Sequence, residues 1–258
     1  MMKQTGQFSS ESGQSASTSA PMRQMPLDLG PIEASALDSY IAGDNEQALS
    51  WLSQWPKVPA GPVYLWGAAG AGKSHLLRGL VEKALALGFG VIWLQGAQCQ
   101  IWDSVDPDGP TVAVMDDCQS LDAHHQHLAF TLFVQAATQG MGLVPGVGEV
   151  PLLSIVAAGD VPPVDLPVRD DLRTRLGWGQ IFALHPLDEA GVRAALIQEA
   201  QRRGISLGEG VVSYLLTRYS RDLTFLMGLL DRLDRFALAE HRWVTVPLLK
   251  QMLALESP

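Results

Sequence analysis

The most informative segment of the chain is Gly67-Ala68-Ala69-Gly70-Ala71-Gly72-Lys73-Ser74. It matches the pattern G-x-x-x-x-G-K-[ST] in full, and it stands between an apolar run at 62–66 and a helix-forming run at 75–87. The glycines let backbone N–H groups approach phosphates, and the start of the following helix adds partial positive charge. Lys73 would reach the β- and γ-phosphates, and Ser74 would bind Mg²⁺. The segment therefore predicts a phosphate-binding loop for a purine nucleoside di- or triphosphate with Mg²⁺.

A second motif, which ends in two acidic residues, follows some forty residues later. The run Val112-Ala113-Val114-Met115 ends in Asp116 and Asp117, which is typical of a buried strand that carries carboxylates at its carboxyl end. We expect Asp116 to hold the Mg²⁺ shell and Asp117 to orient a water. Many buried strands end in Asp at a turn, so this signal gains its weight from the phosphate loop upstream.

Bulk composition argues against several classes of protein. The 258 residues are 47% hydrophobic and 17% charged, with a formal net charge of −9, which argues against a nucleic-acid-binding face as the main surface. The two cysteines, Cys99 and Cys118, are too few for a disulfide framework. With no signal-peptide or membrane-spanning run in the sequence, we expect a cytoplasmic protein that does not bind membranes.

Strand and helix patterns alternate over residues 31–186. Apolar runs at 62–66, 90–94, 111–115, 152–157 and 181–184 are separated by helical runs, which predicts an α/β domain with five parallel strands flanked by helices. From 187 to 258 the periodicity is helical throughout, which predicts a small all-helical second domain. The stretch 140–151 is rich in Gly and Pro, and we expect it to be a flexible loop. Residues 1–21 are rich in Ser, Gln and Gly, and we expect them to be a disordered tail.

These motifs and this two-domain order resemble the AAA+ ATPases, P-loop NTPases with a helical lid domain. The pair Asp116-Asp117, where the commoner pattern is Asp-Glu, is similar to the DnaA branch of that family. So are the sensor 1-like run Ala158-Gly159-Asp160-Val161-Pro162-Pro163, the box Asp171–Gln180 that resembles an arginine-finger box, and Arg221-Asp222-Leu223, which resembles sensor 2. The sequence departs from the family at Val161, where an arginine is common.

Within the DnaA-related group, the chain over 24–255 resembles the Hda family, the regulatory inactivators of DnaA. The short run Gln24-Met25-Pro26-Leu27-Asp28-Leu29 looks like that family's peptide for the replicative sliding clamp, the β subunit of the DNA polymerase. Pro26 favours extended geometry at Met25. Leu27 and Leu29 would then enter one apolar pocket, with Gln24 as a polar anchor. Within residues 22–30 the alternative is a hydrophobic staple that pins the N-terminus to the body.

The resemblance implies a role for each matching residue. Asp160, in the sensor 1-like run, would be one of the catalytic residues, and Arg221 would contact the nucleotide's phosphates from the lid. Gly43 and Asn45 match the turn that contacts the base. Arg175 would be the arginine finger, acting in trans on ATP held by DnaA. Arg173 is the rival for that role. The alternatives for Arg175 itself are a solvated surface arginine, or one paired with Asp170 or Asp171.

The resemblance thus predicts a negative regulator of replication initiation. It would bind ADP or ATP with Mg²⁺, sit on the clamp, reach DNA only through the clamp, and promote hydrolysis of DnaA-bound ATP, while being a weak ATPase itself. A homo-oligomer is compatible with this reading. Two other functions stay open at this point: a DNA-remodelling or helicase-loading ATPase, and a clamp-tethered adaptor without catalytic action.

Overall fold

The computed structural model describes residues 37–57, 61–104, 106, 108–219 and 222–256. Its main sheet has six strands in the order β3-β2-β4-β7-β1-β8. The strands are β1 (Val63–Trp66), β2 (Gly90–Gln95), β3 (Gln98–Trp102), β4 (Thr111–Asp116), β7 (Leu153–Gly159) and β8 (Gln180–Ala183). All neighbours from β2 to β8 pair in parallel, so the predicted five-stranded parallel sheet is confirmed.

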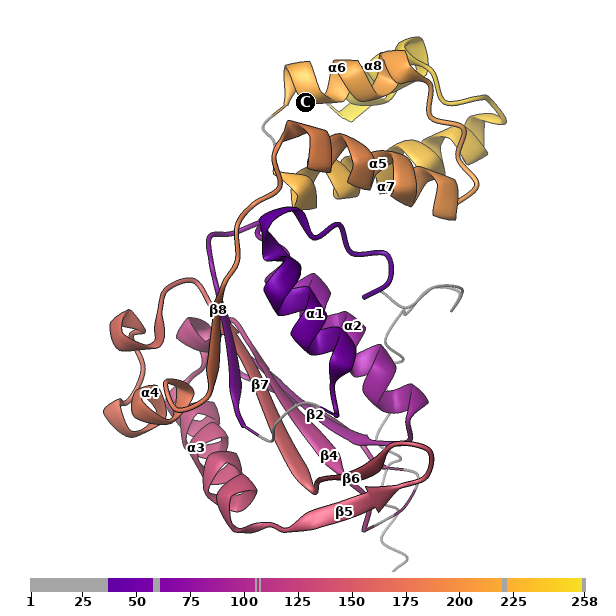
Figure 1. Cartoon of the computed structure of the whole chain (residues 1–258). Helices are drawn as coiled ribbons and strands as arrows, with labels where there is room; N and C mark the ends of the chain where they lie inside the picture. The colour runs from indigo at the N-terminus through magenta and orange to yellow at the C-terminus, as the bar shows by residue number, and fades with distance from the viewer. Residues whose placement is uncertain (1–36, 58–60, 105, 107, 220–221, 257–258) are drawn as a thin grey trace, which may run out of the picture. The chain divides into compact units, whose positions relative to one another are not determined.

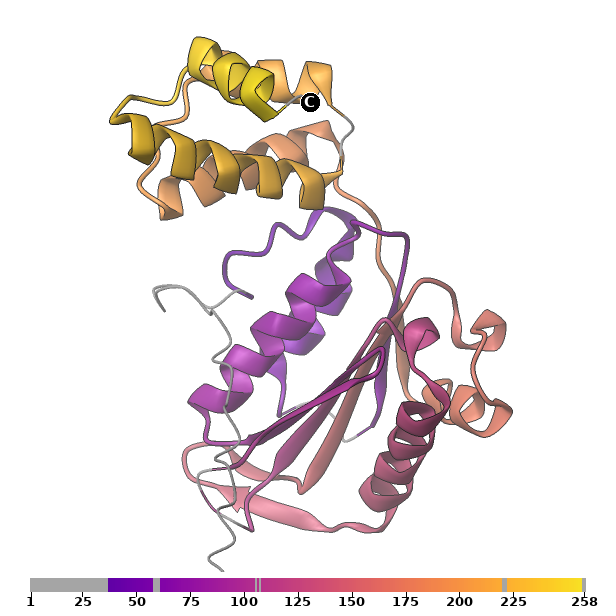
Figure 2. The same ribbon diagram turned by 180° about the vertical axis from the view of Figure 1, so that it is seen from behind.

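Helices cover both faces of this sheet (Figures 1 and 2). One face carries α1 (Glu46–Gln54) and α2 (Lys73–Ala86), and the other carries α3 (Ala123–Thr138) and α4 (Asp170–Leu176). Along β4 the side chains alternate between two cores: Val112 and Val114 belong to the first, and Ala113 and Met115 to the second. All four are fully buried, as expected for a parallel strand covered on both sides.

Short 3₁₀ helices complete the connections of the α/β part. They are η1 (Gly43–Asn45), η2 (Cys118–Ser120) and η3 (Pro163–Asp165). The last two follow β4 and β7 closely, so the acidic residues at the ends of these adjacent strands lie in tight turns.

The stretch predicted to be a flexible loop forms a hairpin instead. Its strands are β5 (Met141–Val144) and β6 (Gly148–Pro151), paired antiparallel. Val144 and Val150 are buried and join the first core, while Leu143 points to solvent. Alternation of buried and exposed side chains, with glycines at positive φ in the turn (Gly146, φ 78°), therefore outweighs the Gly/Pro content that suggested a loop.

The edge strand β3 was not predicted. It pairs antiparallel with β2 through a two-residue turn at Gly96 (φ 59°) and Ala97. Four of its five residues are exposed, including Ile101 at 62%, so the strand lacks the hydrophobic pattern by which strands are recognised in sequence.

The C-terminal part is helical, as predicted. It contains α5 (Glu189–Arg202), α6 (Glu209–Arg218), α7 (Leu223–Glu240) and α8 (Val246–Glu256), which pack around their own core of leucine, valine, alanine and methionine side chains. Asp188 caps α5 by accepting a hydrogen bond from the Gly191 N–H at 2.7 Å. Within the described residues, no helix is both long enough and apolar enough to cross a bilayer.

A close backbone contact fixes where β8 starts. The Gln180 N–H donates to the Pro62 carbonyl at 2.9 Å, and Gly179 packs directly against the same residue. A Cβ added at Gly179 would lie 1.7 Å from the Pro62 oxygen, which only a backbone shift could relieve. A Cβ at Gly177, two residues earlier, would find its nearest neighbour at an ordinary 3.5 Å.

Gly179→Ala should therefore destabilise the protein by the upper part of the range of about 1–3 kcal/mol seen for overpacking, because β8 must move away from β1. Gly177→Ala is the matched control and should stay within about 0.5 kcal/mol of wild type. Urea denaturation followed by circular dichroism measures both, and equal effects of the two substitutions would contradict this account.

Candidate nucleotide site and arginine-finger region

The phosphate loop takes the shape that its glycines allow. It follows β1 and ends where α2 begins at Lys73, with Gly70 (φ 78°) and Gly72 (φ 88°) in the left-handed region. Gly67 lies so close to the next chain segment that a Cβ there would be 2.3 Å from the Leu184 carbonyl oxygen. The loop thus presents bare backbone at the start of a 14-residue helix, an arrangement that suits a phosphate.

Lys73 is held inside this loop. Its side chain is only 6% exposed, and its ammonium group donates to the Gly67 carbonyl at 2.5 Å and the Ala68 carbonyl at 3.1 Å. It also forms an ion pair with Asp160 at 2.9 Å. A nucleotide phosphate would compete with Asp160 for this ammonium, because both are anions that approach the same donor.

The two residues predicted to bind Mg²⁺ are in contact. Asp116, at the end of β4, is fully buried, and burial raises the pKa of its carboxyl group although a hydrogen bond from Ser74 opposes the shift. The Gln95 amide at the end of β2 approaches the same carboxylate at 3.4 Å. The Ser74 hydroxyl, at the start of α2, thus lies beside the Asp116 carboxylate. These two oxygen ligands fit a Mg²⁺ ion that is bound together with a nucleotide.

Asp117 and Asp160 are brought together by a residue that the sequence did not single out. The Gln119 side-chain amide donates to Asp160 Oδ2 at 2.8 Å and approaches Asp117 Oδ1 at 3.5 Å, while its carbonyl oxygen accepts from the Asp160 N–H at 3.3 Å. Asp117 itself adopts the left-handed conformation (φ 50°). The Gln119 amide therefore lies between the two carboxylates and donates toward both, which offsets their mutual repulsion. Only the parallel pairing of β4 with β7 brings the three side chains into reach, so no local pattern in the sequence signals Gln119.

A buried tyrosine of β1 holds the backbone that follows β7. Buried Tyr64 donates its hydroxyl hydrogen to the Val161 carbonyl at 2.9 Å. Burial raises the pKa of this phenol, so it stays a hydrogen-bond donor. Gly159 must be a glycine, since a Cβ there would lie 2.1 Å from the Tyr64 oxygen. The position of Asp160 is thus set by the core and not by the residue at 161, where the sequence departs from the family pattern.

Hydrogen bonds of Asn45 join the short helix η1 to the segment that follows β8. Asn45 is buried, and its side-chain amide exchanges two hydrogen bonds with the His185 backbone, at 2.9 and 2.8 Å. It also donates to the Tyr40 hydroxyl at 3.2 Å, and that hydroxyl lies against the phosphate loop, 3.4 Å from the Ala71 carbonyl oxygen. Gly43, in the same turn, has φ 49°. Because the Asn45 side chain is committed to protein groups, any contact it has with a base would come from its backbone.

The arginines of the box at 169–175 differ in their partners. Arg169 pairs with Asp171, and Arg173 pairs with Asp170. Within the described part of the chain, the Arg175 guanidinium has no carboxylate partner, and it lies over two aromatic rings, 4.3 Å from the centroid of Trp178 and 5.5 Å from that of Phe130. The alternative that Arg175 pairs with Asp170 or Asp171 is therefore excluded in this structure.

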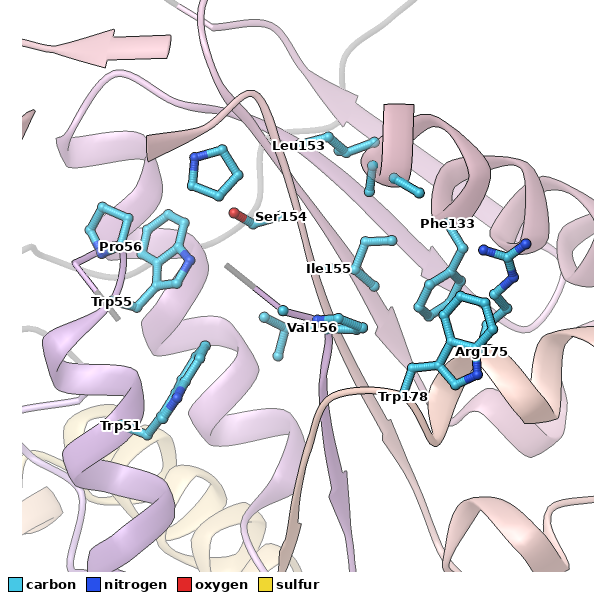
Figure 3. A pocket seen from close by; sticks show the side chains of 15 residues that line it. Trp51, Trp55, Pro56, Phe133, Leu153, Ser154, Ile155, Val156, Arg175 and Trp178 are labelled. Carbon is cyan, nitrogen blue, oxygen red and sulfur yellow. The ribbon is translucent and has the colours of Figure 1, made fainter. Parts of the chain in front are cut away.

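Arg175 also lies at the opposite end of the sheet from the phosphate loop. Together with Trp178 it borders a cavity of about 180 Å³ (Figure 3). The same cavity is lined by Pro62, which precedes β1, and by Leu153, which begins β7. These are the amino ends of parallel strands, whereas the phosphate loop follows the carboxyl end of β1. Arg175 therefore lies at the end of the sheet away from its own chain's phosphate loop.

Other predicted site residues cannot be placed. Gln24, Leu27, Leu29 and Arg221 lie outside the described residues. Asp222, the neighbour of Arg221, caps α7 by accepting from the backbone N–H groups of Thr224 and Phe225 at 2.9 and 3.3 Å.

Comparison with known proteins agrees with this architecture. Residues 188–253 match the family model described as "Hda, lid domain". An uncharacterized protein of Haemophilus influenzae is 29% identical over 239 residues, which are 90% of this chain and 99% of that protein. Domain III of the replication initiation protein DnaA from Thermotoga maritima superposes with a TM-score of 0.63 at 17% identity, covering 89% of this chain and all of that domain. DnaA from Aquifex aeolicus, bound to AMPPCP, superposes with a TM-score of 0.55 at 19% identity over 78% of this chain and 65% of that one. Residues 188–253 are thus similar to the lid domain of the Hda family, and the chain as a whole shares the fold of DnaA domain III.

The buried carboxyl group of Asp116 makes a testable link between site and stability. A folded-state pKa above the unfolded value means that the folded state binds more protons, so this group lowers stability at neutral pH and ceases to do so as pH falls through its folded pKa. Asp116→Asn should therefore raise the free energy of unfolding at pH 7, and the gain should shrink in acid. The same substitution should weaken nucleotide binding in Mg²⁺ but much less in EDTA.

Urea denaturation at pH 7 and pH 5, and isothermal titration with nucleotide in Mg²⁺ and in EDTA, provide the measurements. Asp165→Asn is the control, because Asp165 is an exposed carboxylate. A loss of stability at pH 7 in Asp116→Asn would contradict this account, because it would show that favourable interactions of the Asp116 carboxylate outweigh the cost of burying it.

Proposed function

We propose that this chain is a regulator of replication initiation that binds an adenine nucleotide and promotes hydrolysis of ATP held by a DnaA subunit through Arg175. The single observation that carries the proposal is the state of Arg175. Its guanidinium is free of carboxylates within the described residues, and it lies at the end of the sheet away from its own phosphate loop. An arginine whose guanidinium is unpaired, and which lies away from the phosphate loop of its own chain, is suited to contact a nucleotide bound by an adjacent subunit.

The nucleotide proposed for the chain's own loop is ADP or ATP with Mg²⁺. Backbone N–H groups around Gly67, Gly70 and Gly72 would bind the phosphates, and Lys73 would turn to them from Asp160. Ser74 and Asp116 would hold Mg²⁺, and Asp117 with Asp160 would orient a water. The likeness in fold to an AMPPCP-bound DnaA supports an adenine nucleotide. Gly43, Asn45 and Arg221 would complete the site, with 31–186 as the nucleotide-binding domain and 187–258 as the lid domain.

The proposed action in trans has a sound physical basis. A guanidinium placed against the γ-phosphate of a neighbour's ATP stabilises the negative charge that develops in the transition state. Such a finger contributes roughly 10³–10⁵ in rate. The chain would therefore act mainly as an activator of DnaA's hydrolysis and would have little ATPase activity alone, since its own site lacks a finger from the same chain.

We further propose that residues 22–30 bind the β sliding clamp and that the protein reaches DNA only through it. The support is the sequence of the peptide and the net charge of −9, which disfavours direct binding to a polyanion. We propose that the protein is cytoplasmic. Binding to DnaA is compatible with the formation of a homo-oligomer.

Arg175→Ala should keep the fold and the nucleotide affinity, yet lose nearly all stimulation of DnaA's ATP hydrolysis, by roughly 10³-fold. Arg175→Lys should also fail, because an ammonium lacks the planar fork that spans two phosphate oxygens. The measurement is single-turnover hydrolysis of labelled ATP preloaded on DnaA, with clamp-loaded DNA present.

Arg173→Ala is the matched control for this experiment, since Arg173 sits on the same helix but is paired with Asp170. Stimulation by Arg175→Ala close to wild type would refute the finger assignment and favour an adaptor. Strong DNA-stimulated turnover by this protein without DnaA would favour a motor instead.

Replacing Gln24, Leu27 and Leu29 together with alanine should abolish binding to the immobilised clamp and leave the melting temperature nearly unchanged. The apolar side chains would lose their pocket, while the folded body would lose nothing. A matched triple substitution within the tail, at Gln14, Ser15 and Ser17, should leave clamp binding intact. Retained clamp binding with lost stability would mean that the peptide is a staple for the body.

A further inference from the structure

Trp178 is an exposed aromatic side chain whose position is fixed from both sides. Its side chain is 62% exposed, although its ring lies against Arg175 (Figure 3). Its backbone N–H donates to the Arg175 carbonyl at 3.1 Å, which closes the turn after α4. On its other side, Gly179 packs on Pro62, and Gln180 begins β8. The indole is thus mounted on rigid backbone next to the proposed finger.

The ring engages the part of Arg175 that phosphate recognition does not need. The guanidinium carbon lies over the faces of Trp178 and Phe130, where the π-electrons attract a cation. The N–H donors of a guanidinium lie in its plane and so remain free for a bidentate acceptor. A carboxylate partner would instead occupy those donors, as Asp171 does for Arg169 and Asp170 for Arg173.

Three arginines within seven residues therefore have two kinds of environment. Those bound to carboxylates have their charge neutralised and their donors occupied. The one bound to aromatic faces keeps its full charge and its donors, yet loses much of its rotational freedom. Restricting the side chain before the partner arrives lowers the entropic cost of placing it against a phosphate.

We propose that Trp178 is a positioning residue for Arg175: it holds the guanidinium over its ring, with the N–H edge free, in the pose that meets a phosphate of the neighbour's nucleotide. Phe130, from α3, supports the same pose at longer range. The proposal rests on the proposed function of Arg175 but concerns a separate residue and a separate physical effect.

The test is a double-mutant cycle in the full-length protein with ATP-loaded DnaA and clamp-loaded DNA. Trp178→Ala should lower the maximal single-turnover rate roughly tenfold, about 1.4 kcal/mol, without changing the half-saturating concentration. Trp178→Phe keeps an aromatic face and should restore most of the rate. In an Arg175→Ala background, Trp178→Ala should cause no further loss. Trp243→Ala, which removes an 82% exposed tryptophan between α7 and α8, is the matched control.

A second measurement does not depend on activity. In wild type the indole ring current should shift the NMR signals of the Arg175 side-chain N–H groups, and Trp178→Ala should move them to ordinary values while the melting temperature changes little. Unshifted signals in wild type would overturn the proposal.

The rate data can overturn it in two further ways. A maximal rate for Trp178→Ala equal to wild type would show that the ring positions nothing. A raised half-saturating concentration with an unchanged maximal rate would make Trp178 a docking contact. If Arg175→Ala itself keeps full stimulation, the proposed function fails as a whole. If only Arg175→Ala loses it, the positioning role of Trp178 fails alone.

Discussion

The parallel pairing of β1 with β7 on one side and β8 on the other is the constraint on which the rest of the molecule depends. Because β1 is only four residues long, the same short strand sets both the phosphate loop at its carboxyl end and the Pro62 contact at its amino end. Gly67 abuts the Leu184 carbonyl beyond β8, and Gly179 abuts Pro62 before β1. Two glycines at opposite ends thus lock β1 and β8 in register, and each lies within four residues of a candidate functional group.

Electrostatics at the carboxyl ends of the strands follow from that packing. Asp160 pairs with Lys73, Asp117 lies beside Asp116, and Gln119 links Asp117 to Asp160. Three neighbouring carboxylates would repel one another, and each is stabilised in a different way. Asp116 is buried, with Ser74 and Gln95 as neutral donors, whereas Asp160 is shared between Lys73 and Gln119. The neutral amide of Gln119 would continue to hold Asp160 when phosphates take over Lys73, so binding need not release that carboxylate.

The sequence was sufficient for the parallel sheet, because strands buried on both faces form continuous apolar runs, and for the phosphate loop, because its backbone requires glycine at fixed spacing. It was insufficient wherever the determining contact is long-range. Gln119 acts only because β4 lies beside β7, and Tyr40 lies against Ala71 of the phosphate loop, 31 residues further along the chain. The β3 strand carries too few buried side chains to form a pattern. The β5–β6 hairpin was missed because its two buried valines are separated by glycines and proline, which locally favour a loop.

Separation of the two functional regions has a physical consequence for regulation. The phosphate loop depends on α2 and on the carboxyl ends of the strands, while Arg175 depends on α3, α4 and Trp178 at the other end. No side chain among the contacts described for Arg175 also belongs to the contacts of Lys73 or Asp116. The two regions are nevertheless joined along the chain, because α3 follows Asp117 by way of η2 and α4 follows Asp160 by way of η3. Since Trp178 and Phe130 hold the guanidinium through contacts of their own, we expect its effect on a neighbour to depend mainly on whether that neighbour is docked.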